Sequence, residues 1–309
     1  MEPNWLRLLI GLGAFALPAP SLGQSLDSGS VSALQKEIAQ YEDGQIYPLA
    51  ASFGEMLIEE LEATGAERDL VIREKCRHAR NLALASMLDD ADDALAAIDA
   101  VPAPTGKLTR LGCASDRAIV MLRSARIDEA KLLASSVTAE NGGLPQESLI
   151  QLRALTTLAT ILALQSLHEE SVALHQRAAE EAETLGVKGK TIALQNRIAL
   201  FDAALRTEEP ETVLPDLYAM LDVAVEDYGE TSIWVADFLE RIAHVELSLD
   251  NLDRASRVFD LVLTIRSPDA VGIGPDENRA FLYSGIAAQR LDMFLGKPID
   301  KGGGIDISA

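Results

Sequence analysis

The residues of this chain that could do chemistry are few and scattered. The histidines are His78, His168, His175 and His244. His168 and His175 are seven residues apart, which places both on one helical face. Together with the adjacent Glu169 and Glu170 they are a candidate set of metal ligands. A helical zinc motif of the HExxH type needs its histidines four residues apart, and the sequence has no such motif. We therefore expect no metal ligands.

Other catalytic motifs are also missing from the sequence. The glycine-rich stretches "GIGPDE" at Gly272 and "GGGI" at Gly302 lack the Lys and Ser/Thr of a phosphate loop, and no GxSxG or CxxC occurs. Asp89, Asp90 and their neighbours stand at a predicted helix start, where they complement the helix dipole. We expect no cofactor and no catalytic residues. The alternative is an enzyme whose site assembles from distant residues.

Composition and charge narrow the class of protein. Apolar residues make up 48% of the 309 residues and aromatics only 5%, so Ala and Leu must build the core, which favours helices. The formal net charge of −21 opposes binding to nucleic acid or anionic lipid. Such a charge serves solubility, or it favours basic partners.

The first residues are typical of a secretory signal peptide. An apolar run from Leu8 to Leu17 is followed by prolines and by Ser21-Leu22-Gly23, which predicts cleavage before Gln24. The run is shorter than the ~20 residues of a spanning helix, although an uncleaved anchor is the alternative. We expect a periplasmic or secreted protein with no membrane insertion after cleavage.

From about residue 30 onward, apolar residues recur at three- and four-residue spacing, which predicts helices throughout. Residues 24–66 are expected to form N-terminal capping helices, 67–295 a helical repeat domain and 296–309 a flexible tail. The predicted helices are 30–43, 47–64, 67–87, 89–100, 107–124, 127–140, 146–166, 168–185, 189–206, 210–228, 231–249, 252–267 and 276–295.

An interval of twelve residues between small side chains recurs along the chain. Ala243 and Ala255 show it, and both must be small where two helices cross closely. The same interval separates Ala79 from Ala91, Ala118 from Ala130 and, more loosely, Ala159 from Ser171. First-helix landmarks then stand about 40 residues apart, which is the sign of an array of helical hairpins.

At this point the chain resembles the tetratricopeptide repeat (TPR) family, in the long-period variant seen in kinesin light chain. Its units open with a "G…VA..L..LA" pattern, matched here by Gly229, Val235, Ala236, Leu239, Ile242 and Ala243. The likeness covers roughly residues 67–295 and is poor over 189–228, where Pro215 is expected to interrupt the second helix of the fourth unit. The resemblance implies an all-α, right-handed superhelical solenoid of antiparallel helix hairpins.

The resemblance also implies a function and a binding surface. It implies a non-catalytic scaffold that holds a protein or peptide segment in its concave groove. A regulatory or sensor module of an envelope system is a further alternative. Offsets of −6, −3, +1 and +4 from each landmark give the expected groove residues Arg73, Arg80, Arg153, Thr160, Asn196, Asp237, Glu240, His244, Arg279 and Gln289. The arginines would hold acidic groups, unless they merely pair with neighbouring acids.

The only cysteines, Cys76 and Cys113, precede Ala79 and Ala118 by three and five residues. On adjacent parallel first helices they would lie at nearly the same height, which makes a disulfide plausible in an exported protein. The alternative is two buried thiols that act as small apolar side chains.

Overall fold

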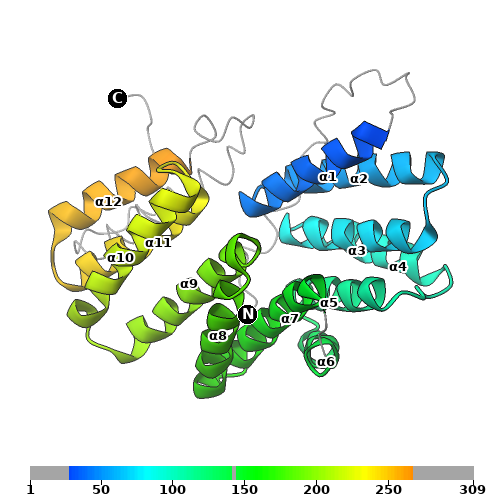
Figure 1. The fold of residues 1–309 in the computed structure, drawn as a ribbon. Coiled ribbons are helices and arrows are strands. Elements are labelled where there is room, and N and C mark those ends of the chain that lie inside the picture. Colours follow the sequence, from blue (N-terminus) through cyan, green and yellow to red (C-terminus); the bar gives the residue numbers. More distant parts are fainter. Residues whose placement is uncertain (1–27, 141–143, 267–309) are drawn as a thin grey trace, which may run out of the picture.

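A computed structural model describes residues 28–140 and 144–266, and every regular element in these ranges is helical (Figure 1). The predicted signal segment, the helix 276–295, the tail, Arg279 and Gln289 all lie outside the described residues. The helices are α1 Ser28–Asp43, α2 Tyr47–Ala63, α3 Arg68–Leu84, α4 Leu88–Asp99, α5 Lys107–Arg123, α6 Ile127–Thr138, α7 Pro145–Leu164, α8 His168–Glu183, the 3-10 turn η2 Gly186–Lys188, α9 Lys190–Thr207, α10 Pro210–Tyr228, α11 Ile233–Ser248 and α12 Leu252–Ile265.

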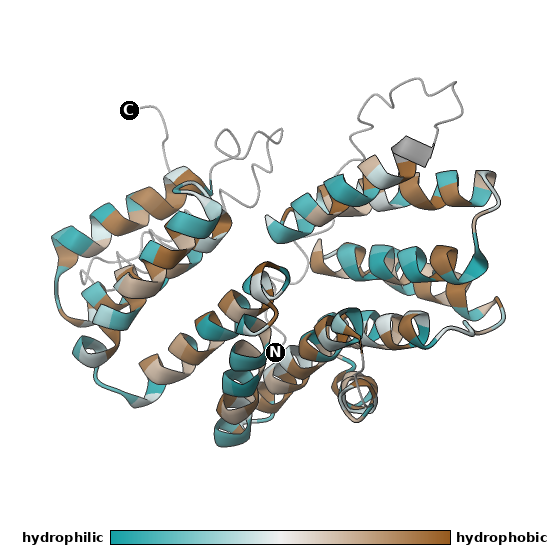
Figure 2. Cartoon of the chain, viewed as in Figure 1, coloured by the Kyte–Doolittle hydropathy of each residue, from teal (hydrophilic) through white to brown (hydrophobic). Residues whose placement is uncertain are grey.

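The helices form antiparallel pairs that follow one another around an arc, from α1–α2 through α7–α8 to α11–α12 (Figure 1). The first helices α3, α5 and α7 pack on one another in sequence, and α4, α6 and α8 pack against their own partners. Helices such as α4, α5 and α12 carry both a hydrophobic and a hydrophilic face (Figure 2), as stacking on neighbours requires. The predicted all-α solenoid of helix hairpins is confirmed.

The alanines at the helix crossings are buried as the sequence predicts. Ala79, Ala91, Ala118, Ala130, Ala243 and Ala255 have no exposed surface. In the α7–α8 pair, where the match is looser, the Ser171 hydroxyl donates a hydrogen bond to the carbonyl oxygen of Ala159 at 2.8 Å. A small polar side chain is therefore accommodated at a close crossing by bonding to the backbone.

One turn geometry repeats between paired helices. In five pairs, a non-glycine residue with positive φ lies two residues after the end of the first helix. These residues are Gln45, Ser86, Ala125, Ser166 and Asp250. These positions recur about every 40 residues, with one unit missing between Ser166 and Asp250. Because Gln45 belongs to this series, α1–α2 has the turn of a repeat unit, although the sequence predicts only capping helices there.

The pair α9–α10 is the unit that lacks this turn. It is joined by extended residues, Glu208 and Glu209, which lead into Pro210 at the start of α10. α9 packs mainly on α8, and α10 mainly on α11. The expectation that Pro215 interrupts this helix is wrong, since α10 runs unbroken through it. Pro215 is the sixth residue of α10, so it removes one backbone hydrogen bond, to the carbonyl oxygen of Glu211, while the helix continues to Tyr228.

α7 is the only helix within the described ranges that is long and apolar enough to cross a membrane, with a mean hydropathy of 1.3. Over half of that stretch, 56%, is buried inside the protein. Its neighbours are α5, α6 and α8. The composition of α7 is thus that of a core helix at the centre of the arc.

Candidate functional site

The concave side of the arc encloses a cavity of about 830 Å³. It is lined mainly by α1, α3, α5, α7 and the start of α9, which are first helices of their pairs, and also by Tyr47 at the start of α2 and by η2. Its side chains include six basic and four acidic groups, so the cavity has a basic surplus in a chain of net charge −21. The apolar part of the wall consists of Leu84, Leu108, Ile119, Leu122, Leu149, Ile150, Val187 and Ile192.

The lining residues occupy equivalent positions on successive first helices. Eleven of them lie at offsets −6, −2, +1 and +5 from the landmark alanines, a spacing of four, three and four residues that marks one face of a helix. The set is Arg73, Arg77, Arg80 and Leu84 in α3, Gly112, Asp116, Ile119 and Arg123 in α5, and Arg153, Thr157 and Thr160 in α7.

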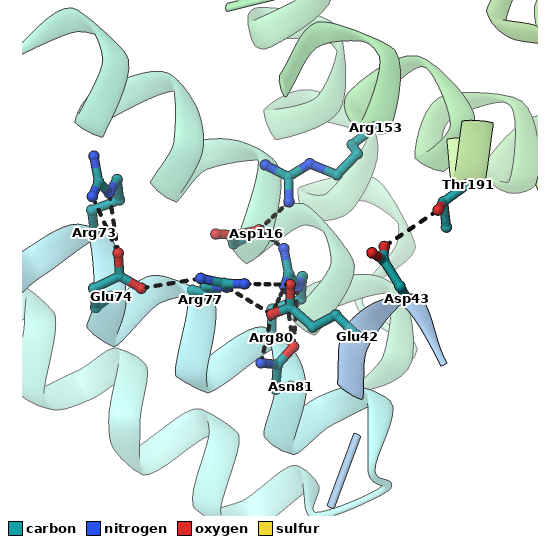
Figure 3. Close-up of polar contacts among 10 residues, drawn as sticks. All are labelled: Glu42, Asp43, Arg73, Glu74, Arg77, Arg80, Asn81, Asp116, Arg153 and Thr191. Carbon is teal, nitrogen blue, oxygen red and sulfur yellow. Dashed lines mark hydrogen bonds and ion pairs between the residues drawn. The ribbon is translucent and has the colours of Figure 1, made fainter. Parts of the chain in front are cut away.

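Glu42, the penultimate residue of α1, is the centre of the charge network in this cavity (Figure 3). Its carboxylate accepts two hydrogen bonds of 2.7 Å from Arg77, one of 2.8 Å from the Asn81 amide and another from Arg80. Burial alone would raise the pKa of Glu42, but the charges of Arg80 and Arg77 and these hydrogen bonds outweigh it and lower the pKa to about 2. Glu42 is therefore ionised at any physiological pH.

Two further acids complete the network. Arg80 is buried and donates to Asp116 at 3.0 Å, while Glu74 accepts a hydrogen bond of 3.2 Å from Arg73. Glu42 and Asp116 raise the pKa of Arg80 even though burial lowers it. Arg73 and Arg80 thus line the cavity as predicted, but their guanidinium groups are already bonded to acids of the chain.

Arg153 differs from the other arginines of the cavity. Its Nη1 lies 4.0 Å from Asp116 Oδ1, and its buried Nε has no hydrogen-bond partner among the described residues. The side chain is 35% exposed, and Figure 3 shows it extending toward Asp116. Desolvation lowers its pKa despite the nearby Asp116. The cavity therefore contains a partly buried cation whose buried Nε is not bonded to any group of the described chain.

Asn196 is a correction to the predicted groove. It is fully buried, its Oδ1 lies 2.7 Å from His175 Nδ1, and its amide donates to Thr156 at 2.8 Å and to the Ile192 carbonyl oxygen at 2.7 Å. The −3 offset points toward neighbouring helices in α3 and α5 as well, because Cys76 and Ser115 are fully or almost fully buried at this offset. Asn196 therefore joins α7, α8 and α9 in the core and does not line the cavity.

Three other predicted groove residues lie on α11, outside the cavity wall. Asp237 and Glu240 bind Arg266 at 2.6 and 3.0 Å. His244 packs edge-on against Phe259, with ring centroids 5.4 Å apart. Of the predicted residues that the structure describes, Arg73, Arg80, Arg153 and Thr160 line the cavity.

Sequence reasoning missed Glu42, Arg77 and Asp116. Arg77 and Asp116 stand at the −2 offset, which continues the helical stripe defined by −6 and +1. The signal was therefore present in the spacing. Glu42 had no such signal, because it reaches the cavity from α1, which was expected only to cap the array.

Cys76 and Cys113 form a disulfide in the structure, with their Cα atoms 5.2 Å apart. The bond joins α3 to α5, the first helices of adjacent pairs, at the level expected from their offsets. Among the described residues, no group of three or more His, Cys, Asp or Glu could hold a metal ion.

No protein-family model and no curated protein matches the chain. A crystal structure of the apo form of RapI matches with a TM-score of 0.53 and 13% sequence identity, over 88% of this chain and 78% of RapI. The chain is a helical repeat solenoid. At this identity the likeness shows the fold alone, and the kinesin-light-chain-like variant stays a prediction.

Proposed function

We propose that this protein is a non-catalytic scaffold whose cavity binds a short peptide or protein segment that carries a carboxylate. The observation behind this proposal is Arg153, a partly buried guanidinium with a buried Nε that lacks a hydrogen-bond partner in the part of the chain described. A cation in such a place is stabilised by an anion that accepts its hydrogen bonds. A ligand carboxylate would supply those acceptors, in the two-pronged geometry that guanidinium favours.

The rest of the cavity supports a peptide as the bearer of that carboxylate. Its volume is within the range of ligand pockets, and its aliphatic wall could bury apolar side chains next to the charged group. Extended segments suit the concave side of a helical repeat array, because equivalent residues recur along successive first helices. The ligand class is thus a short segment with both aliphatic and acidic groups.

The proposal includes export. The apolar run before Gln24 supports passage through a membrane, and a disulfide between Cys76 and Cys113 suits an oxidising compartment. A periplasmic or secreted scaffold would meet its segment outside the cytosol.

Selection from peptide pools tests the proposal. Random hexapeptides with free C-terminal carboxylates are enriched on the purified protein, and the best binder is resynthesised with a fluorescein label. We expect Arg153→Ala to weaken its affinity, measured by anisotropy, by at least tenfold, about 1.4 kcal/mol. Arg153→Lys should recover only part of the loss, because lysine keeps the charge but not the guanidinium fork.

Arg177→Ala is the matched control, since Arg177 is an arginine on the outer helix α8 that pairs with Glu181. It should leave the affinity unchanged, and circular dichroism should show equal helicity for all variants. A C-terminally amidated peptide with Asn and Gln in place of its acids should not bind. Equal binding by wild type and Arg153→Ala would contradict the proposal.

A further inference from the structure

The end of α1 connects two parts of the solenoid that are far apart in sequence. Asp43 accepts hydrogen bonds from the Trp234 indole Nε1 at its carbonyl oxygen, at 2.8 Å, and from the Thr191 hydroxyl at its carboxylate, at 3.3 Å. The Gln45 amide donates to Asp237 at 3.4 Å. Residues 42–45, which we name the bridge, thus span from the α3 side of the cavity to α9 and α11.

The bridge is attached to the rest of the cavity by polar contacts. α1 packs along its length on α2, and its apolar residues Leu34 and Ile38 belong to a cluster formed with α2 and the start of α3. Glu42 meets α3 through its carboxylate, which is bonded to Arg77, Arg80 and Asn81. Moving the bridge away would therefore break hydrogen bonds and ion pairs but would leave the apolar packing of α1 in place.

The Glu42 carboxylate makes the same kind of contact that a carboxylate of the proposed ligand would make. A carboxylate held by two guanidinium groups and an amide is what a peptide with an acidic group would form with Arg77, Arg80 and Asn81. Leaving these buried arginines without an acid is costly, so Glu42 can depart only if another anion takes its place. Arg153 is on the same side of the network, since it shares Asp116 with Arg80 (Figure 3).

We propose that Glu42 is a built-in competitor for the ligand carboxylate, and that a ligand bound to Arg77, Arg80 and Arg153 displaces it and releases the bridge from α9 and α11. This inference rests on the proposed function and adds its regulation. In the ligand-free protein the bridge keeps the two sides of the cavity joined. In the bound protein the same arginines are satisfied from outside the chain, and the cavity is free to widen.

Trp234 gives a natural reporter for the bridge, because its indole N–H bonds to Asp43 in the closed arrangement. The full chain is labelled with 15N-tryptophan, the signal is assigned with Trp234→Phe, and the hydrogen exchange of the indole proton is measured by NMR. Glu42→Gln keeps the size of the side chain but removes its charge. We expect indole exchange at least tenfold faster in Glu42→Gln than in wild type.

Glu59→Gln is the matched control, because Glu59 is an exposed glutamate on α2. The Trp234 indole proton should exchange as fast in this variant as in wild type. The wild-type protein provides a second measurement that needs no substitution. The peptide selected from the hexapeptide pool should accelerate indole exchange in wild type, and it should bind Glu42→Gln about tenfold more tightly than wild type.

The two proposals fail in different ways. Unchanged indole exchange in Glu42→Gln overturns the competitor, whatever the peptide does. A peptide that needs Arg153 but binds wild type and Glu42→Gln equally well also overturns it and leaves the proposed function standing. If no peptide binds either protein, the proposed function is rejected and the competitor with it.

Discussion

At the scale of the residue, the cavity is dominated by acids and arginines, and some of these side chains make far more hydrogen bonds than others. Glu42 accepts hydrogen bonds from three side chains, whereas the Arg153 guanidinium has only the distant Asp116. Such a network is stabilising when complete and costly when one member is removed. An added anion should therefore form its most favourable interactions at Arg153, the member of the network with the fewest hydrogen bonds.

The ionisation of Glu42 makes a prediction about stability and pH. Its pKa in the folded protein is about 2, below the value of 4.5 for a free glutamate, so its contribution is present above pH 4.5 and is lost as the pH falls through 2. The shift corresponds to about 3 kcal/mol. We expect Glu42→Gln to lower the free energy of unfolding in urea by about that amount at pH 7, and by much less near pH 2.

Glu59→Gln serves again as the charge-matched control and should show no such pH-dependent difference from wild type. A Glu42→Gln deficit that stays constant between pH 7 and pH 2 would show that the loss comes from packing and not from the charge.

At the scale of the element, the repeated turn between paired helices carries a conformational cost. Ala125 is exposed and adopts φ of 60°, a left-handed conformation that is unfavourable for residues with a Cβ. No glycine occupies the equivalent position of the other four such turns. The turn geometry is thus imposed by the packing of the two helices it joins, against the preference of the residue.

Replacing Ala125 by glycine should therefore stabilise the protein by about 1 kcal/mol, because glycine adopts positive φ without steric cost. Ala139 is a matched control, since it is also exposed and follows a helix, but with φ of −78°. Ala139→Gly should destabilise by up to about 1 kcal/mol. Chemical denaturation measures both, and a destabilised Ala125→Gly would contradict the turn geometry.

At the scale of the whole molecule, an arc of stacked pairs would ordinarily be open, because each pair contacts only its neighbours. Here two devices join more distant parts. The disulfide ties the second pair to the third, and the bridge links the first pair to α9 and α11. The bridge depends on a few polar contacts, whereas the disulfide depends on the redox state of the compartment.

The proposed export into an oxidising compartment leads to a further prediction. Protein isolated from its native source should begin at Gln24 and contain no free thiol in denaturant, because an exported chain folds under oxidising conditions. Reduction should lower the free energy of unfolding by roughly 3–4 kcal/mol, since the bond closes a loop between positions 37 residues apart. N-terminal sequencing and thiol counting measure the first part, and an intact Met1 with two free thiols would reject export.

The sequence by itself determined the helical class, the hairpin array and the buried alanines at its crossings. These properties are local or periodic: the small residues at a twelve-residue interval fix how two helices cross, whatever lies elsewhere in the chain. The offsets −6 and +1 likewise found Arg73, Arg80, Arg153 and Thr160. The offset −3 failed for Asn196, because it points to a neighbouring helix.

Only the tertiary structure decided which arginines are already satisfied. Glu42 approaches Arg77 and Arg80 from a helix some 35 residues earlier, and Asp43 meets Trp234 across 191 residues. The contact between Asp43 and Trp234 is encoded in no periodicity of the sequence, because it depends on how far the arc curves between α1 and α11. That curvature is the sum of small rotations between successive helix pairs, which the spacing of residues within a single unit does not reveal.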